Sequence, residues 1–305
     1  MKLHYIITKC AFILISAVIT TGIKAQEPDP AIIKMMPAIP VEITEPMQRA
    51  EYLSMHFWDK FDFSDASFFM NNSLPERCFV DFLDLLSIVP AGTRDKSIDI
   101  LLKKSEASKS VFSFILKLSE RYLYEPESPV YDEEKLIPFV QYALQSTILD
   151  DTEKIRPRFL LENISINRLG SVASDFDYIL MNGEKGNLHS VNAEHTLLYF
   201  NDPDCEDCAM LIKQLIASTT ISNLINRGKL KTIMTYVNDD IEAWEKHASE
   251  IPDTWIYTRE AEQKIIIEGI YNIKQFPTIY LLDKDKKVLL KDTTFENLES
   301  YFRNF

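Results

Sequence analysis

The chain has little glycine and little cysteine for its length of 305 residues. Only 7 glycines are present, and they form neither a Gly-x-Gly-x-x-Gly nor a Walker pattern. Such loops let backbone N–H groups cradle phosphates, so the sequence gives no support for a nucleotide site of either type. The 4 cysteines are too few for a disulfide-stapled scaffold. No cluster of cysteine and histidine has metal-ligand spacing, so we expect neither a metal nor a cofactor.

Basic residues are also in deficit. Lysine and arginine number 33 against 46 aspartates and glutamates, which gives a net charge of −13. Nucleic acids and anionic membrane surfaces repel a protein with this balance. We therefore expect no nucleic-acid partner and no membrane contact beyond an N-terminal targeting segment.

The N-terminal residues differ in character from the rest of the chain. Residues 1–25 combine basic residues, the apolar stretch Cys10–Ile19 and a small residue, Ala25, at their end. This pattern is typical of a secretory signal peptide that is cleaved after Ala25, and it predicts a periplasmic or otherwise exported protein. An uncleaved N-terminal anchor is the alternative, and it also exports the remaining chain. The proline-rich residues 26–46 predict an extended lead-in.

Residues 47–168 predict a small all-α domain. Its segments are amphipathic, and proline or other turn-forming residues separate most of them. Cys78 shares a predicted helix face with Phe82 and Leu85, so we interpret it as a core residue rather than a reactive thiol. No motif indicates what this domain does. The expected helices are 50–61, 75–89, 94–104, 108–124, 132–147 and 153–163.

After Gly170 the pattern changes to strands that alternate with helices. This alternation predicts an α/β sheet with helices on both faces. Asp239 or Asp240 can cap one of the helices, and we interpret Trp244 and Trp255 as packing residues. The expected strands are 176–181, 188–191, 196–200, 230–237, 254–257, 278–282 and 287–291, and the expected helices are 209–216, 220–226, 241–248, 260–271 and 296–302.

A Cys-x-x-Cys pair stands where a predicted strand is followed by a helix. Cys205 and Cys208 come after the turn-forming residues 201–204 and before the helix 209–216. Unpaired N–H groups and the dipole at a helix N-terminus favour negative charge, and this promotes the thiolate form of cysteine. The spacing also brings both sulfurs onto one turn, close enough for a short-loop disulfide. The pair therefore predicts dithiol chemistry.

A second signal is a proline immediately before an apolar strand. Pro277 precedes the strand 278–282, and it lies well beyond Cys208 in the chain, after intervening strand and helix units. A proline at this position marks a special backbone geometry, of which a cis peptide bond is one option.

These features together resemble the thioredoxin fold, specifically its secreted TlpA/ResA-like kind, over residues 172–305. The whole chain is similar to secreted thioredoxin-like proteins of Bacteroidota that carry an N-terminal helical domain without an assigned function. The resemblance implies that Cys205 is the exposed nucleophile and that Cys208 is the more buried resolving thiol. It also implies a cis Pro277. The residues implied to contact the substrate chain are Phe276, Pro277 and Thr278.

The chain departs from the family pattern at four positions. Asp204 stands where the family usually has tryptophan, and Asp207 stands where it often has proline. Tyr199 and Leu211 occupy positions at which thioredoxins and ResA-like proteins, respectively, carry a buried acid. The sequence therefore does not indicate which group moves the proton during exchange.

The expected function is that of an exported thiol-disulfide oxidoreductase with a redox-active Cys205–Cys208 centre. Its expected partners are protein disulfides and an envelope thiol donor. Asp204, Glu206 and Asp207 crowd the sulfurs and oppose the helix dipole, which favours the reducing direction.

Three other interpretations stay open at the sequence level. A non-catalytic exported binding or scaffold protein with a degenerate thioredoxin module is the main alternative, and Tyr199 and Leu211 favour it. A purely structural disulfide is disfavoured by the strain and small stabilisation of short loops. A zinc site is disfavoured by the lack of four ligands. The sequence does not indicate the oligomeric state.

Overall fold

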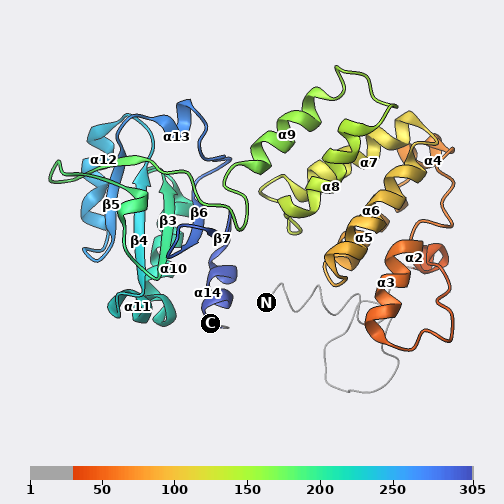
Figure 1. The fold of residues 1–305 in the computed structure, drawn as a ribbon, viewed down its shortest axis with the longest axis horizontal. Helices are drawn as coiled ribbons and strands as arrows, with labels where there is room; N and C mark the ends of the chain where they lie inside the picture. Colours follow the sequence, from red (N-terminus) through yellow and green to blue (C-terminus); the bar gives the residue numbers. More distant parts are fainter. Residues whose placement is uncertain (1–29, 304–305) are drawn as a thin grey trace. The chain divides into compact units, whose positions relative to one another are not determined.

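The computed structural model describes residues 30–303, so the signal segment expected over 1–25 lies outside the described residues. The chain divides into two compact units, Met1–Leu161 and Glu162–Phe305 (Figure 1). In the described residues the first unit is all helical, and the second is built on a seven-stranded sheet.

The boundary between the two units lies between Leu161 and Glu162, and residues of the segment that follows it bond to the second unit. The backbone N–H of Gly170 donates to the carbonyl of Val288 at 2.8 Å. The Nζ atom of Lys291 donates to the carbonyl of Ile166 at 2.9 Å. These bonds satisfy polar backbone groups that have no regular secondary structure of their own.

The helical unit follows the amphipathic pattern of its sequence. The side chain of Asp132 caps one helix by accepting from the backbone N–H of Lys135 at 3.0 Å. Its helices are α2 (Pro30–Met35), α3 (Pro46–His56), α4 (Ala66–Asn71), α5 (Leu74–Leu86), α6 (Ala91–Ser105), α7 (Lys109–Leu123), α8 (Glu133–Gln145) and α9 (Ile155–Ser165), the last of which continues into the second unit.

Two short helices correct the sequence-based prediction. The proline-rich lead-in is not extended at Pro30–Met35, which forms α2. Proline is compatible with the first turn of a helix, because the N–H group that it lacks has no partner there. The sequence did not predict α4, which the side chain of Asp65 begins by accepting from the N–H of Phe68 at 3.0 Å.

Aromatic side chains fill the core of the helical unit. Trp58 and Phe82 are almost fully buried, and their ring centroids lie 5.6 Å apart. Edge-on and tilted contacts between aromatic rings stabilise a core by more than the burial of their apolar area alone. Cys78 on α5 is 0% exposed, which confirms its predicted core role.

The sheet of the second unit has the strand order β2-β1-β5-β4-β3-β6-β7. The neighbours β3, β4 and β5 are parallel, whereas β6 runs antiparallel to β3. This mixed sheet with helices confirms the predicted α/β class. The strands are β1 (Asp177–Leu180), β2 (Lys185–Asn187), β3 (His195–Asn201), β4 (Leu230–Tyr236), β5 (Ile256–Glu260), β6 (Thr278–Asp283) and β7 (Val288–Leu290).

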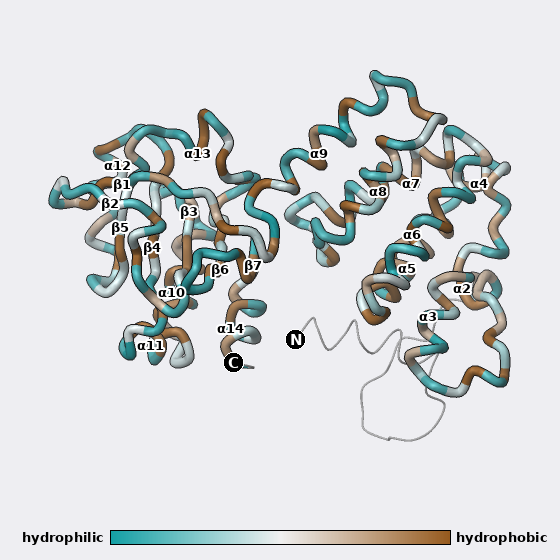
Figure 2. The backbone as a smooth tube through the Cα atoms, in the orientation of Figure 1, coloured by the Kyte–Doolittle hydropathy of each residue, from teal (hydrophilic) through white to brown (hydrophobic). Residues whose placement is uncertain are grey.

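The two faces of the sheet are covered by different segments of the chain. Alternate residues of β3 enter opposite cores, with Leu197 and Tyr199 on one face and Leu198 and Phe200 on the other. The hydropathy of these segments can be followed in Figure 2. The core with Tyr199 lies under four helices, which are α10 (Glu206–Ala217), α11 (Thr219–Asn226), α12 (Ile241–His247) and α14 (Phe295–Arg303).

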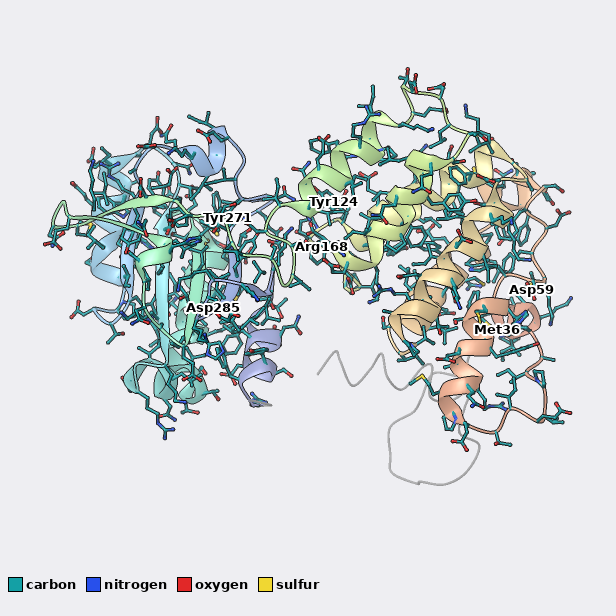
Figure 3. All side chains as sticks on the ribbon, viewed as in Figure 1. Met36, Asp59, Tyr124, Arg168, Tyr271 and Asp285 are labelled. Carbon is teal, nitrogen blue, oxygen red and sulfur yellow. The ribbon has the colours of Figure 1, made fainter. Side chains whose placement is uncertain are left out.

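The opposite face corrects the expectation of helices on both sides, because irregular segments provide most of its cover. Its core includes Ala173, Phe176 and Tyr271, together with residues of a 3₁₀ turn, η1 (Leu188–Ser190), and of the short helix α13 (Lys264–Ile267). The hydroxyl of Tyr271, which Figure 3 labels, donates to the carbonyl of Ser174 at 2.6 Å. A side-chain hydrogen bond thus holds this irregular segment against the sheet, in the absence of backbone bonds of a regular helix or strand.

The predicted strand at 188–191 is wrong. Those residues form η1, and β2 lies just before them at Lys185–Asn187. Gly183 adopts a φ of 83° in the turn between β1 and β2, so the chain reverses earlier than the sequence suggests.

The predicted helix 260–271 is too long. Glu260 ends β5, and its buried carboxylate accepts from the backbone N–H groups of Glu262 and Ile265. Gly269 has a φ of 64°, which a continuing helix does not permit. Only the four residues of α13 remain helical between these two points.

One further 3₁₀ turn, η2 (Ala248–Glu250), follows α12. Within residues 30–303, no single helix has the length and apolar character needed to span a membrane. The pair α10 and α11, bent by 70°, meets that test together by length and composition only.

Candidate active site

The register of the central strands places the two sequence motifs at one edge of the sheet. Phe200 on β3 pairs with Thr278 on β6. Because the two strands are antiparallel, the residues after Asn201 and the residues before Thr278 leave the sheet on the same side. The cysteine segment and the Phe276–Pro277 segment therefore meet, although 71 positions separate Cys205 from Phe276.

Cys205 is the N-cap residue of α10 and is partly exposed. Its Sγ atom accepts from the backbone N–H of Cys208 at 3.1 Å. Its thiol lies 3.5 Å from the carbonyl oxygen of Phe276, to which it can donate. The Phe276–Pro277 peptide bond is cis, as the family resemblance implies. Cys205 thus lies between a helix N-terminus and the backbone of a neighbouring segment.

Phe276 and Thr278 anchor that neighbouring segment. The ring of Phe276 is partly buried and packs against the cores of both sheet faces. Thr278 is buried at the first position of β6, and its hydroxyl donates to the carbonyl of Gln275 at 2.7 Å. The segment is therefore fixed on both sides of Pro277.

Cys208 lies in the first turn of α10 and is 1% exposed. Burial raises the pKa of its thiol to about 12. The backbone N–H of Asp202 lowers this pKa as a hydrogen-bond donor, neighbouring Cys205 raises it, and the Tyr199 hydroxyl lowers it. The two sulfurs thus differ in access, because one is open to a partner and the other is enclosed.

Asp202 braces the loop that carries the cysteines. Its carboxylate accepts from the backbone N–H of Asp204 at 3.1 Å and from the side-chain amide of Asn238 at 2.9 Å. Its carbonyl accepts from the N–H of Cys205 at 3.2 Å. The pairing of Asp202 with Asn238 was not predicted from the sequence. The available signal was that they follow the adjacent parallel strands β3 and β4 by one and two residues.

Acidic side chains surround the exposed sulfur. Glu206 and Asp207 lie in the first turn of α10, and both are exposed, as is Asp204. Carboxylates in this position stabilise the helix through its dipole but disfavour a nearby thiolate. Among residues 30–303, no group of three or more histidine, cysteine, aspartate or glutamate residues could hold a metal ion.

Tyr199 and Leu211, where the resemblance implies a buried acid, both belong to the apolar cluster that contains Cys208. Tyr199 is 0% exposed, and its hydroxyl donates to the carbonyl of Cys208 at 3.0 Å. Leu211 belongs to the same apolar cluster as Cys208. A phenol therefore takes one of these places and an apolar side chain takes the other.

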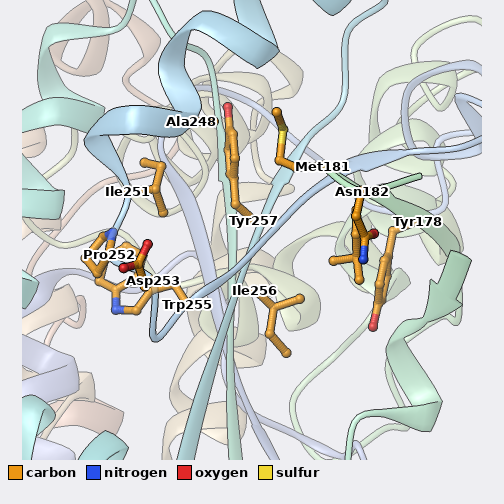
Figure 4. A pocket seen from close by; sticks show the side chains of 11 residues that line it. Tyr178, Met181, Asn182, Ala248, Ile251, Pro252, Asp253, Trp255, Ile256 and Tyr257 are labelled. Carbon is orange, nitrogen blue, oxygen red and sulfur yellow. The ribbon is translucent and has the colours of Figure 1, made fainter. Parts of the chain in front are cut away.

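A groove of about 490 Å³ opens elsewhere on the second unit and includes neither cysteine (Figure 4). Its walls come from the end of β1, from the residues after α12 and from β5. Trp244 is buried and lies outside this wall, as expected of a packing residue, whereas Trp255 is buried and also forms part of the wall. The lining residues are Tyr178, Leu180, Met181, Asn182, Ala248, Ile251, Pro252, Asp253, Trp255, Ile256 and Tyr257.

Comparisons with known proteins give one family model and several solved structures. Residues 19–167 match the family model described as a domain of unknown function, DUF5106. No curated protein matches the chain. The C-terminal domain of an uncharacterized protein from Bacteroides fragilis is 39% identical, with a TM-score of 0.45, and the match covers 46% of this chain and 99% of that one. The thioredoxin domain of a thiol-disulfide oxidoreductase from Bacteroides vulgatus is 22% identical, with a TM-score of 0.40, over 45% of this chain and 96% of that one.

One solved structure matches both units. A thioredoxin-like protein from Bacteroides caccae is 37% identical, with a TM-score of 0.85. The match covers 88% of this chain and 97% of that protein. Likeness at this level extends over the helical unit as well as the sheet, and it agrees with the fold described above. The chain therefore belongs to the family of thioredoxin-like proteins represented by this Bacteroides caccae protein, and it carries a DUF5106 domain as its helical N-terminal part.

Proposed function

We propose that the protein is a thiol-disulfide oxidoreductase that reduces disulfides of partner proteins through Cys205 and Cys208. The observation that carries the proposal is the pairing of a partly exposed sulfur with a buried one, one helical turn apart. The carbonyl of Phe276 beside the exposed sulfur supports it, because an incoming chain there meets backbone that is already positioned.

The exchange consists of two displacements at sulfur. The Cys205 thiolate attacks a partner disulfide, so that one partner sulfur leaves as a thiolate and takes a proton. The Cys208 thiol then loses its proton and attacks the Cys205 sulfur, which releases the second partner thiolate. The partner gains two electrons and two protons, and the protein is left with a Cys205–Cys208 disulfide. We infer that an envelope thiol donor returns this disulfide to the dithiol.

The electrostatics of the site support the reducing direction. Burial disfavours the charged form of Cys208, as its raised pKa indicates. The exposed carboxylates of Asp204, Glu206 and Asp207 add negative charge to the segment that carries both sulfurs. A dithiol with a poorly stabilised thiolate gives up its electrons more readily. Export through the expected signal segment would place the protein where disulfides persist.

Trapping of a reaction intermediate tests the proposal. In the full-length protein with the exchange Cys208→Ser, the second displacement cannot occur, so insulin or another disulfide protein should remain bound to Cys205. Mass spectrometry after non-reducing electrophoresis should locate that bond. Cys205→Ser should form no adduct, whereas Cys78→Ser should leave insulin reduction unchanged because Cys78 is buried in the other unit.

The alternative is a non-catalytic binding or scaffold protein. The absence of a carboxyl group at Tyr199 and Leu211 is the observation that favours it. Failure of the wild type to reduce insulin, together with the absence of any Cys208→Ser adduct, would support this alternative and contradict the proposed activity.

A further inference from the structure

Tyr199 is a buried phenol in an otherwise apolar setting. It lies at the centre of β3 and is 0% exposed, in a cluster with Leu197, Leu211 and Trp244. A hydroxyl taken out of water costs free energy unless it is hydrogen bonded, and phenylalanine would fill nearly the same space without that cost. The position of the hydroxyl therefore requires an explanation beyond packing.

The hydroxyl of Tyr199 is directed to the first turn of α10. It donates to the carbonyl of Cys208 at 3.0 Å, and it also interacts with the Cys208 thiol as a hydrogen-bond partner. The sheet and the helix are both regular at this point, so the phenol is held next to the sulfur by rigid elements.

We propose that Tyr199 is a catalytic residue of the resolving step, in which its hydroxyl shifts its one hydrogen bond from the Cys208 carbonyl to the Cys208 sulfur as that sulfur becomes a thiolate. This inference rests on the proposed function and deepens it. In the displacement, Cys208 loses its proton, the new Cys205–Cys208 bond forms, and the bond between Cys205 and the partner sulfur breaks. The departing partner sulfur takes up a proton from solvent, which balances the proton that Cys208 has lost.

The phenol acts as a donor and not as a base. Burial raises the pKa of Tyr199 well above its ordinary value, so the hydroxyl keeps its proton throughout the cycle. A hydrogen bond to a charged acceptor is stronger than one to a neutral acceptor, and a water-free site strengthens it further. The phenol therefore favours the Cys208 thiolate over the thiol, although it carries no charge.

Few other groups act on the buried sulfur. From the loop before α10, the backbone N–H of Asp202 donates to it, and on α10 itself the Cys205 sulfur faces it. The facing strand β3 contributes Tyr199, and the segment before β6 contributes the carbonyl of Phe276 to the neighbouring Cys205. Among these groups, Tyr199 is the side chain of the facing strand that brings an O–H donor to the first turn of α10, so its removal should be measurable.

The exchange Tyr199→Phe tests the inference by separating the two displacements. In stopped-flow reactions of the full chain with 5,5′-dithiobis(2-nitrobenzoate), attack by Cys205 and resolution by Cys208 each release one coloured thiolate. We expect the rate of the first phase to stay within about twofold of the wild-type rate. The rate of the second phase should fall by roughly tenfold or more, because the variant loses one hydrogen bond to a charged group. The pH midpoint of the second phase should also move upwards, which a purely structural role would not cause.

Tyr280→Phe is the matched control, because Tyr280 is equally buried on the opposite face of the same sheet. A second phase in Tyr199→Phe that equals those of Tyr280→Phe and wild type would overturn the inference while leaving the proposed function intact. Loss of both phases in the wild type would instead contradict the proposed function.

A second variant covers the case in which Tyr199→Phe does not fold. Site-specific 3-fluorotyrosine at position 199 keeps the phenol and makes it a stronger donor. We then expect a faster second phase with an unchanged first phase. An unchanged second phase in this folded variant would overturn the inference.

Discussion

At the scale of single residues, His195 links stability to pH. It stands at the first position of β3 and is only 4% exposed. Burial lowers the pKa of its imidazole; Glu194 and Asp283 oppose this shift, and Lys229 adds to it. The unfolded chain therefore binds a proton at a higher pH than the folded chain does. Stability should be highest above pH 6.5 and should fall as the pH drops from there towards the folded pKa.

Urea unfolding between pH 8 and pH 5 measures this effect. In His195→Gln the loss of unfolding free energy on acidification should be smaller than in wild type, whatever the absolute stability of the variant. His189→Gln provides the control, since His189 is exposed and its ring bonds to the carbonyl of Ala173 at 2.8 Å. Equal pH slopes for wild type and His195→Gln would contradict the prediction.

At the scale of elements, Cys205 has a structural role beside its chemical one. It is the N-cap of α10, and its sulfur accepts from the backbone N–H of Cys208. Serine is among the preferred N-cap residues, whereas alanine cannot accept this bond. We expect Cys205→Ala to lower the unfolding free energy by about 0.5–2 kcal/mol relative to Cys205→Ser.

Chemical denaturation of the two reduced variants at pH 7 tests the capping role. Both lack the same thiol, so their difference isolates the cap from any effect of disulfide formation. Asp240→Ala gives a comparison at another cap, because Asp240 accepts from the N–H of Ala243 at 3.0 Å at the start of α12. Equal stability of Cys205→Ala and Cys205→Ser would show that the sulfur does not cap α10.

The elements that the sequence predicts well are those with a strong local signal. The strands β3, β4 and β6 have apolar runs that few other structures accommodate, and Asp240 caps α12 as one of two predicted candidates. The elements that it predicts poorly depend on distant contacts. The start of α13 depends on the buried carboxylate of Glu260, which accepts from the N–H of Ile265. Glu260 is the last residue of β5, and β5 pairs with β1 and β4, which are distant in the sequence.

The same distinction applies within the candidate site. Cys205, Cys208 and Pro277 carry motifs that can be read locally, and the structure brings their segments together. The hydroxyl of Tyr199 carries no such motif, because its partner is nine residues away on a facing helix. The bond between Asp202 and Asn238 likewise depends on the register of two strands, which composition does not reveal.

At the scale of the whole molecule, acidity is the property most relevant to partner choice. The chain has a net charge of −13, and three exposed carboxylates, Asp204, Glu206 and Asp207, belong to the segment of the exposed sulfur. None of the three pairs with a basic side chain in the described part of the chain. At roughly 8 Å in water, each carboxylate changes the energy of a unit charge by about 0.5 kcal/mol. A positively charged disulfide should therefore reach Cys205 more often than a negative one.

Three small disulfides of similar size test this expectation. Cystamine is cationic, hydroxyethyl disulfide is neutral and dithiodipropionate is anionic, and the neutral compound corrects for the intrinsic reactivity of Cys205. At low salt we expect cystamine to react about tenfold faster than the neutral compound and the anion to react more slowly still. At about 1 M salt the three rates should converge, since screening then acts within about 3 Å.

Substitution of the carboxylates locates the source of the preference. The combined exchange Asp204→Asn, Glu206→Gln and Asp207→Asn should reduce the ratio of the cystamine rate to the dithiodipropionate rate by roughly a hundredfold, because the three local charges act with opposite sign on the cation and on the anion. The matched exchange Glu127→Gln, Glu184→Gln and Asp253→Asn removes the same number of exposed charges outside the cysteine segment and should leave the ratio almost unchanged. If both variants lower the ratio equally, the net charge of the protein selects the partner, and the local carboxylates do not. A preference that follows only the local carboxylates would mean that physiological partners present basic side chains around the disulfide that Cys205 attacks.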